Sequence, residues 1–269
     1  LTKRYKRPRL KHLRRIAIDE ICIGKGHKYL TVVLNLSSGA VVYVGDGKGG
    51  DALQVFWKRL KRSRARVEAV AVDMSPAFTA AIIENLPSAA IVYDRFHIMK
   101  MYNEKIDDLR RGLQREAEDN LQKSVLKGTR WLLLKNPENL DPDPKKREKE
   151  RLEDALKLNE PLATAYYLRE ELREFWNQSS RAEAEEVLDN WIQSAASTGI
   201  KVLIDMARSL QAHRFGLLNW YDFPISTGPL EGTNNKIKTL QRAAYGFRDK
   251  EFFKLKIMAL HETKYALVG

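Results

Sequence analysis

Short runs of β-branched and other apolar residues, separated by glycine-rich or serine-rich turns, occupy the first part of the chain. They predict five strands, at 16–24, 29–36, 40–47, 67–75 and 89–97. Two segments between them have the apolar spacing of helices, 50–64 and 76–87. The order β-β-β-α-β-α-β predicts an α/β fold: a mixed sheet of three antiparallel strands plus two parallel strands, flanked by helices.

The pattern becomes helical after the fifth predicted strand. A long amphipathic stretch covers 98–126, and a break rich in proline and charge follows at 136–147. Helical patterns then resume and continue to about residue 219. We therefore expect four parts: a basic arm at 1–15, the first part of the core at 16–122, an all-helical insertion at 123–219, and closing helices of the core at 220–269.

Composition restricts the class of protein. The 269 residues are 43% apolar, enough to fill an interior, and no stretch approaches the roughly 20 apolar residues of a membrane span. The lone cysteine, Cys22, excludes an intramolecular disulfide or a cysteine-based zinc cluster and favours a reducing, cytoplasmic setting. The first residue is Leu1 rather than Met, which indicates a piece of a longer protein.

The net charge of +12 favours polyanionic partners, nucleic acid before an anionic membrane surface. The first fifteen residues contain eight Lys or Arg. Such a segment is either a solvated, disordered arm or a segment that binds the phosphates of nucleic acid. The two are compatible, because an arm that is flexible when free can still bind nucleic acid.

Two aspartates lie on apolar strand patterns, Asp19 in "AIDEI" and Asp73 in "AVDMS". A carboxylate there is costly unless it is paired or binds a metal, and neither stretch has an adjacent cation. If the first and fourth strands are neighbours, the two carboxylates meet at one edge of the sheet. Glu231, at the start of the last long helix, can complete the cluster. Three oxygen donors suit Mg²⁺ or Mn²⁺, and two such ions can cut a phosphodiester.

Each acid also has a structural reading. A lone Asp at a strand end is most often a turn or cap residue, and Glu231 alone suits the first turn of a helix because it complements the helix dipole. The three together favour a metal site, because the predicted order of elements brings them to one place.

Five stretches resemble the DDE transposases of bacterial insertion sequences, specifically the ISL3 family: "AIDEICIGKGHKYLTVVLNLSSGAVV", "VAVDMSPAF", "IVYDRFHIMK", "LLLKNPENL" and "WYDFPISTGPLEGTNNKIKTLQRAAYGFRD". They run in order from about residue 16 to 262, and the last is the most specific. The resemblance implies a ribonuclease-H-like catalytic domain in which Asp19, Asp73 and Glu231 are the catalytic acids. It also implies a helical insertion before the last catalytic helix, and DNA pairing by a homodimer.

The resemblance includes one departure. Family members are longer at the N-terminus, where a zinc-binding segment and a helix-turn-helix precede the catalytic domain. Neither pattern occurs in this sequence, so this piece alone is not expected to recognise transposon ends.

The helix that begins near Glu231 is rich in groups able to contact DNA. Cations on it can neutralise phosphates, and two amides can bond phosphates or base edges. The predicted DNA-binding residues are Asn234, Asn235, Lys236, Lys238, Arg242 and Arg248. The alternatives are a plain solvated face for the cations and helix capping for the amides.

Four further residues have two readings each. Asp94 is either an accessory acid or an ion-pair partner, and His97 either contacts the scissile phosphate or is structural. Trp131 and Trp220 can stack on an unpaired base, but their apolar neighbours favour core packing, above all for Trp131.

The sequence thus predicts a metal-dependent transposase catalytic domain, acting on transposon ends and target DNA at the bacterial nucleoid. A ribonuclease-H-like nuclease or resolvase would share the acids but only hydrolyse DNA. A DNA-binding regulatory factor derived from a transposase would lack catalysis, and the presence of all three acids argues against it.

Overall fold

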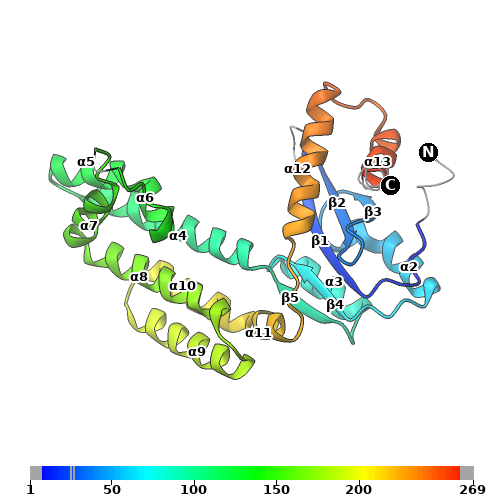
Figure 1. The fold of residues 1–269 in the computed structure, drawn as a ribbon, viewed down its shortest axis with the longest axis horizontal. Helices are drawn as coiled ribbons and strands as arrows, with labels where there is room; N and C mark the ends of the chain where they lie inside the picture. The colour runs from blue at the N-terminus through cyan, green and yellow to red at the C-terminus, as the bar shows by residue number, and fades with distance from the viewer. Residues whose placement is uncertain (1–7, 25, 27, 144, 261–269) are drawn as a thin grey trace. The chain divides into compact units, whose positions relative to one another are not determined.

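The computed structural model describes residues 8–24, 26, 28–143 and 145–260. The chain forms two compact units (Figure 1). The first comprises Leu1–His97 and Phe215–Gly269, and the second comprises Ile98–Arg214. The two units group residues that contact one another, whereas the four predicted parts follow the hydrophobic pattern of the sequence. The boundaries of the four parts therefore stay predictions.

A five-stranded sheet organises the first unit. Its strands are β1 (Arg15–Gly24), β2 (Lys28–Asn35), β3 (Val41–Asp46), β4 (Ala69–Val72) and β5 (Ala90–Tyr93). Their order is β3-β2-β1-β4-β5, with β1 antiparallel to β2, β2 antiparallel to β3, and β4 parallel to both β1 and β5. This order confirms the predicted mixed sheet of ribonuclease-H-like type.

Helices of the first unit come from both ends of the chain. They are η1 (Gly50–Leu53), α2 (Gln54–Ser63), α3 (Pro76–Asn85), α11 (Arg214–Asp222), α12 (Gly228–Ala243) and α13 (Lys250–Met258). Buried side chains of α12 and α13 pack against one face of the sheet. Together with every second residue of the strands, they form one hydrophobic core cluster. Ala17 and Ile21 belong to this cluster, so the face of β1 that α12 and α13 cover also carries position 19.

The second unit is built from helices. They are α4 (Arg95–Glu116), α5 (Asn120–Gly128), α6 (Arg130–Leu134), η2 (Pro137–Asn139), α7 (Glu148–Leu158), α8 (Glu160–Glu174), η3 (Phe175–Asn177), α9 (Arg181–Ser197) and α10 (Lys201–Ala212). α4 begins two residues after β5 and crosses from the first unit into the second. Trp191 joins three of these helices, because its ring packs edge-on against Tyr102 and its Nε1 donates to the Leu168 carbonyl at 2.6 Å.

The basic N-terminal segment is only partly described, since residues 1–7 of the predicted arm lie outside the described residues. Of the remainder, Leu10 and Leu13 are buried, and the Pro8 carbonyl accepts a hydrogen bond from Arg59 at 3.1 Å. Residues 8–14 are thus packed against the first unit rather than free in solvent. Within the described part of the chain, no helix combines the length and apolar character needed to cross a membrane.

Candidate active site

The register of β1 and β4 brings two of the predicted acids together. Ala17 of β1 pairs with Ala71 of β4 in parallel register, and Asp19 and Asp73 each lie two residues further along. Both acids therefore continue the face that α12 and α13 cover. The two carboxylates interact, because the charge of Asp73 raises the pKa of Asp19.

Two hydrogen bonds hold the Asp19 carboxylate. Its Oδ1 accepts from the Glu20 backbone N–H at 2.7 Å, and its Oδ2 accepts from Asn234 Nδ2 at 2.8 Å. Burial is the main cause of a raised pKa for Asp19, and Asp73 and Glu20 raise it further. The hydrogen bond from Glu20 and the charge of His97 oppose that rise without cancelling it. Asp19 is therefore a carboxylate for which ionisation is costly in the absence of a cation.

Asp73 follows β4 directly and begins the turn into α3. Its Oδ1 accepts from the Ser75 backbone N–H at 3.0 Å, and Ser75 is the N-cap residue of α3, with Pro76 at the first helical position. This local hydrogen bond agrees with the turn role considered for a lone Asp at a strand end, and it leaves the second carboxylate oxygen available for another ligand. Structural and functional readings of Asp73 are therefore compatible.

Asn234 lies on α12, and its side chain connects that helix to β1. It is only 6% exposed, so it faces the interior, whereas the predicted DNA-binding residues Asn235, Lys236, Lys238, Arg242 and Arg248 are exposed. Its Nδ2 binds Asp19, and its Oδ1 is buried without a hydrogen-bond partner. A buried amide oxygen without a donor beside a carboxylate is a ready ligand for a cation.

Glu231 precedes Asn234 by three residues, which puts the two on neighbouring positions of one helix face. The Glu231 side chain is exposed. Among the described residues, no group of three His, Cys, Asp or Glu side chains is close enough to hold a metal ion. The three predicted acids are accordingly not a closed cluster here, and the assignment of Glu231 stays a prediction.

Asp94 has an environment different from that of Asp19. It is 2% exposed and accepts three hydrogen bonds: from the Phe96 N–H at 2.6 Å, from the Thr227 hydroxyl at 2.6 Å, and from the Thr227 N–H. Thr227 is the N-cap residue of α12. Asp94 therefore connects the end of β5 to the start of the helix that carries Glu231 and Asn234.

Two residues of the candidate site, Glu20 and Thr227, were not predicted from the sequence. Glu20 accepts from the Gly49 N–H at 2.8 Å, and burial, followed by the nearby charge of Asp73, raises its pKa. Thr227 was also missed, although "STGPL" is typical of a helix start, since a Ser or Thr precedes a first-turn proline. No local pattern could reveal that Thr227 donates to an aspartate 133 residues earlier.

The two tryptophans differ from one another. Trp220 packs against the core cluster of the first unit, as favoured from the sequence. The core prediction for Trp131 is wrong, because its side chain is 66% exposed and the Arg130 guanidinium lies over its ring at 4.7 Å. Leu132 and Leu133 are buried beside it, so the apolar run of α6 packs on one side while Trp131 lies on the other.

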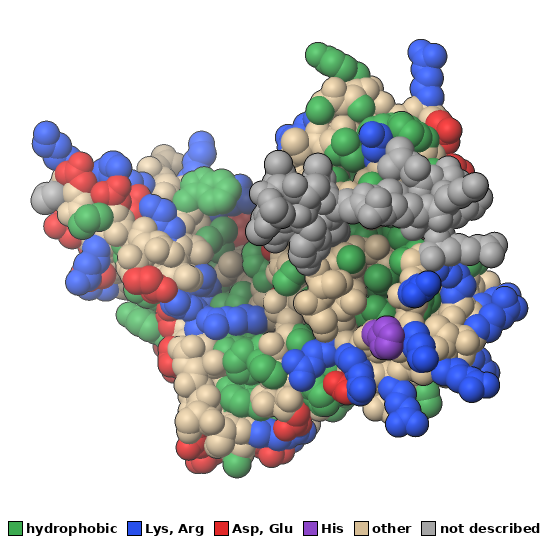
Figure 2. Space-filling view, turned by 45° about the vertical axis from the view of Figure 1, so that its right-hand side comes forward, with side chains coloured by type: hydrophobic (Ala, Val, Ile, Leu, Met, Phe, Trp, Pro, Cys, Tyr) green, Lys and Arg blue, Asp and Glu red, His purple; other side chains and the backbone are tan. Residues whose placement is uncertain are grey.

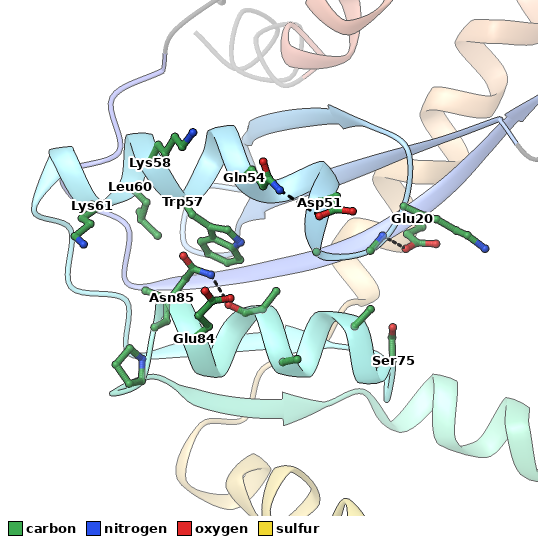
Figure 3. Close-up of a pocket in the computed structure, with 18 of the residues that line it drawn as sticks. Glu20, Asp51, Gln54, Trp57, Lys58, Leu60, Lys61, Ser75, Glu84 and Asn85 are labelled. Atoms are coloured by element: carbon green, nitrogen blue, oxygen red, sulfur yellow. Dashed lines mark hydrogen bonds between the residues drawn. The ribbon is translucent and has the colours of Figure 1, made fainter.

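A groove begins beside the acids and runs between α2 and α3. It encloses about 1420 Å³ and extends from Glu20 and Ser75 to Asn85, with Trp57, Lys58 and further residues along it (Figure 3). Its charged residues are of both signs. Figure 2 shows Lys and Arg side chains gathered over the lower right of one face, which agrees with the net charge of +12.

Comparisons with known proteins bear on the family of this chain. The sequence model of the ISL3 family of DDE transposases, described as "Transposase", matches residues 16–257. The chain is 37% identical over 247 residues to the transposase for insertion sequence element IS1001 of Bordetella parapertussis, covering 91% of this chain and 60% of that protein. It is 31% identical over 266 residues to the transposase for insertion sequence element IS1557 of Mycobacterium tuberculosis, covering 90% and 59%. The chain thus spans about 60% of the length of these curated relatives.

Proposed function

The chain belongs to the ISL3 family of DDE transposases, and we propose that it is the catalytic part of an insertion-sequence transposase. In this proposal it cuts DNA by attack of water and joins the freed 3′-hydroxyl to a target strand. The observation that carries the proposal is the hydrogen bond from Asn234 to Asp19 at 2.8 Å. It holds α12, the helix of Glu231, against the strand position where Asp19 and Asp73 lie side by side.

Asp19, Asp73 and Glu231 would hold Mg²⁺ or Mn²⁺, in a site for two ions. The donor set fits such ions, because it consists of hard oxygen ligands. The raised pKa of Asp19 and the unpartnered Asn234 Oδ1 support the same assignment. A cation would stabilise the ionised form of Asp19, and it would accept Asn234 Oδ1 as a ligand. When bound, the ions supply activation of a water or hydroxyl nucleophile and stabilisation of the leaving oxygen.

The protein's own contribution is the positioning of these groups. Glu20 N–H and Asn234 fix both oxygens of Asp19, and Asp94 fixes the first turn of α12 through Thr227. The charge of His97 lowers the pKa of Asp19, and in this proposal His97 would contact the scissile phosphate. Such positioning accounts for most of the catalysis in phosphodiester exchange, which needs little covalent help from the protein.

The exposed residues of α12 and the loop after it would bind the DNA backbone. Lys236, Lys238, Arg242 and Arg248 are exposed and cationic, and Asn235 can bond to phosphate or base edges. In the second unit, Trp131 with Arg130 over its ring offers a stacking surface for an unpaired base. We also propose that two copies assemble on paired transposon ends, in the bacterial cytoplasm at the nucleoid.

The direct test is metal-dependent nicking. The full-length protein is incubated with a labelled duplex that carries the end of its own insertion sequence, with and without Mg²⁺. Ala variants at Asp19, Asp73 and Glu231 should each reduce nicking by about 100-fold or more while DNA binding in EDTA is retained. Glu251→Ala is the matched control, because Glu251 is an exposed acid on α13. A variant of the three that nicks like the parent removes that acid from the site.

A second assay separates the alternatives. A duplex with a pre-cut end is offered together with a plasmid target. Joining of the end to the plasmid supports a transposase, whereas nicking without joining supports a nuclease or resolvase. Binding that survives Asp73→Asn, with no metal-dependent cleavage by the parent, supports a regulatory DNA-binding factor.

A further inference from the structure

An aromatic side chain projects from the loop that follows α12. Tyr245 has a relative exposure of 101%, the highest among the exposed large hydrophobic residues described. Its backbone is left-handed, with φ of 50°, and Gly246 after it has φ of 94°. The chain thus reverses sharply at a tyrosine and a glycine, in the most specific of the sequence stretches.

Neither packing nor backbone preference explains a tyrosine at this position. A bulky residue with positive φ is unfavourable, and glycine or asparagine would adopt the conformation with less strain. A fully exposed ring cannot offset the strain by burial. Local strain of this kind concentrates at functional sites, where the side chain serves another purpose.

The surroundings hold the tyrosine in place. The Tyr245 N–H donates to the Arg242 carbonyl at 3.0 Å, and the Gly246 N–H donates to the Gln241 carbonyl at 2.9 Å. The Gln241 side chain in turn donates to the Ile23 carbonyl of β1. On the other side, Phe247 stacks on Phe253 of α13 with ring centroids 4.5 Å apart. The ring of Tyr245 is therefore carried on an anchored turn.

The neighbouring side chains in the sequence are basic. Lys238, Arg242, Arg248 and Lys250 are all exposed. Glu231 precedes Tyr245 by fourteen positions, which is about 21 Å along a helix. A DNA strand whose phosphates contact these cations would therefore run past Tyr245. Its bases at that point would lie well away from Asp19, Asp73 and Glu231.

We propose that Tyr245 stacks on an unpaired base of the bound DNA. This inference rests on the proposed function and adds a contact with a base to it. Every base has a π-face, so the contact tolerates any sequence and requires only that the base is not paired within the duplex. The tyrosine would hold such a base while the cations bind the backbone on either side.

The test is an affinity measurement without catalysis. Fluorescence anisotropy in EDTA compares a duplex containing one unpaired base with the fully paired duplex. Tyr245→Ala should weaken binding to the first by about 5- to 140-fold, with a smaller effect on the second. Tyr245→Phe retains the ring and should bind like the parent. Tyr167→Ala is the control, since Tyr167 is an exposed tyrosine (58%) of the second unit.

Two further readouts separate stacking from other roles. The slope of log affinity against log salt should be unchanged in Tyr245→Ala, whereas Arg242→Ala should make it shallower by about 0.9. Tyr245→Asn should raise the midpoint of thermal unfolding, because asparagine tolerates positive φ, and yet weaken binding to the unpaired-base duplex as Tyr245→Ala does.

Three results overturn the inference. If the parent binds but Tyr245→Ala binds equally well, only the inference about Tyr245 is wrong. The same holds if Tyr245→Asn loses thermal stability together with affinity, because the tyrosine would then be structural. If the parent binds neither duplex, the inference and the proposed function both fail.

Discussion

Two aspartates of similar local sequence acquire opposite properties from their surroundings. Asp19 and Asp94 both extend the same sheet face, and both follow a run of apolar strand residues. Asp94 accepts three hydrogen bonds, two of them from Thr227. Asp19 is partly buried near other acids, and its pKa is raised. A carboxylate with enough donors stabilises a fold, whereas one that lacks them is suited to binding a cation.

Removal of the Asp94 carboxylate should unfold the first unit more readily. Asp94→Ala leaves both Thr227 donors without their acceptor, so we expect the free energy of unfolding to fall by about 3 kcal/mol. Thr227→Val loses only the hydroxyl and should cost about 1 kcal/mol. Urea denaturation of the two variants and the parent measures both values. Equal stability of Asp94→Ala and the parent would contradict the proposed connection between β5 and α12.

At the scale of single elements, one glycine decides how closely α11 approaches β5. A Cβ on Gly216 would lie 2.3 Å from the ring of Tyr93, which is buried and bonds through its hydroxyl to Thr79. The Asn219 amide, one turn later, donates to the Ile91 carbonyl at 2.9 Å. The absence of a side chain at Gly216 thus permits a helix and a strand to pack at close range.

Two glycine substitutions should have opposite effects. Gly216→Ala forces the Cβ against Tyr93 and should lower the free energy of unfolding by about 2 kcal/mol. Gly112→Ala, within α4, meets no heavy atom within 4 Å. It should raise stability by about 0.5–1 kcal/mol, because alanine favours the helix. Thermal unfolding of both variants tests the pair, and a neutral Gly216→Ala would show that α11 can move away without cost.

An ion cluster on α4 should make the second unit sensitive to acid. Asp107 accepts from Arg110 at 2.7 Å and Arg111 at 2.6 Å, and Arg130 lies 3.4 Å away. Burial alone would raise the pKa of Asp107, but the hydrogen bond and charge of Arg110, with the charges of Arg130 and Arg111, lower it below its ordinary value of 3.8. The stabilisation is therefore present above pH 3.8 and is lost as pH falls through the lowered pKa.

Asp107→Asn should lower the free energy of unfolding at pH 7 by about 3 kcal/mol, because it leaves the buried Arg110 without its charge partner. The difference from the parent should shrink as pH falls below the ordinary value of 3.8. Urea denaturation across pH 2.5–7 is the measurement. The neighbouring Asp108, exposed at 68%, is the control, and Asp108→Asn should change stability by less than about 0.5 kcal/mol. A difference independent of pH would contradict the assignment.

At the scale of the whole molecule, the charge of +12 favours association with the DNA that we propose this chain binds. Each phosphate that a cation neutralises releases counterions, so affinity falls as salt rises. Simultaneous replacement of Lys236, Lys238 and Arg242 by Ala should make the slope of log affinity against log salt shallower by about 2.7. Anisotropy titrations of a duplex at several salt concentrations measure the slope.

The control keeps the total charge equal. Ala at Lys149, Lys157 and Lys201 removes three positive charges from exposed positions of the second unit. It should leave the slope nearly unchanged if contact with phosphates, rather than overall charge, is what matters. Equal effects of the two triple variants would mean that α12 has no special place in DNA binding.

Much of the architecture could be predicted from the sequence. The strands begin and end within a few residues of their predicted limits, because alternation and turn residues are local signals. The proximity of Asp19 and Asp73 also followed, since neighbouring parallel strands bring equivalent positions to one level. Trp131 was mispredicted, because an apolar run does not show which of its side chains the surrounding helices will cover.

The sequence by itself determined the order of strands and helices, the family and the acids at strand positions, because these depend on residue type and spacing along the chain. Only the tertiary structure decided what each acid contacts: Asn234 bonds to Asp19, and Thr227 bonds to Asp94. The physical reason is that hydrogen bonds and burial arise between segments as much as 218 residues apart. Such contacts leave no periodic trace in the sequence, and they determine whether a carboxylate is structural or suited to binding a metal.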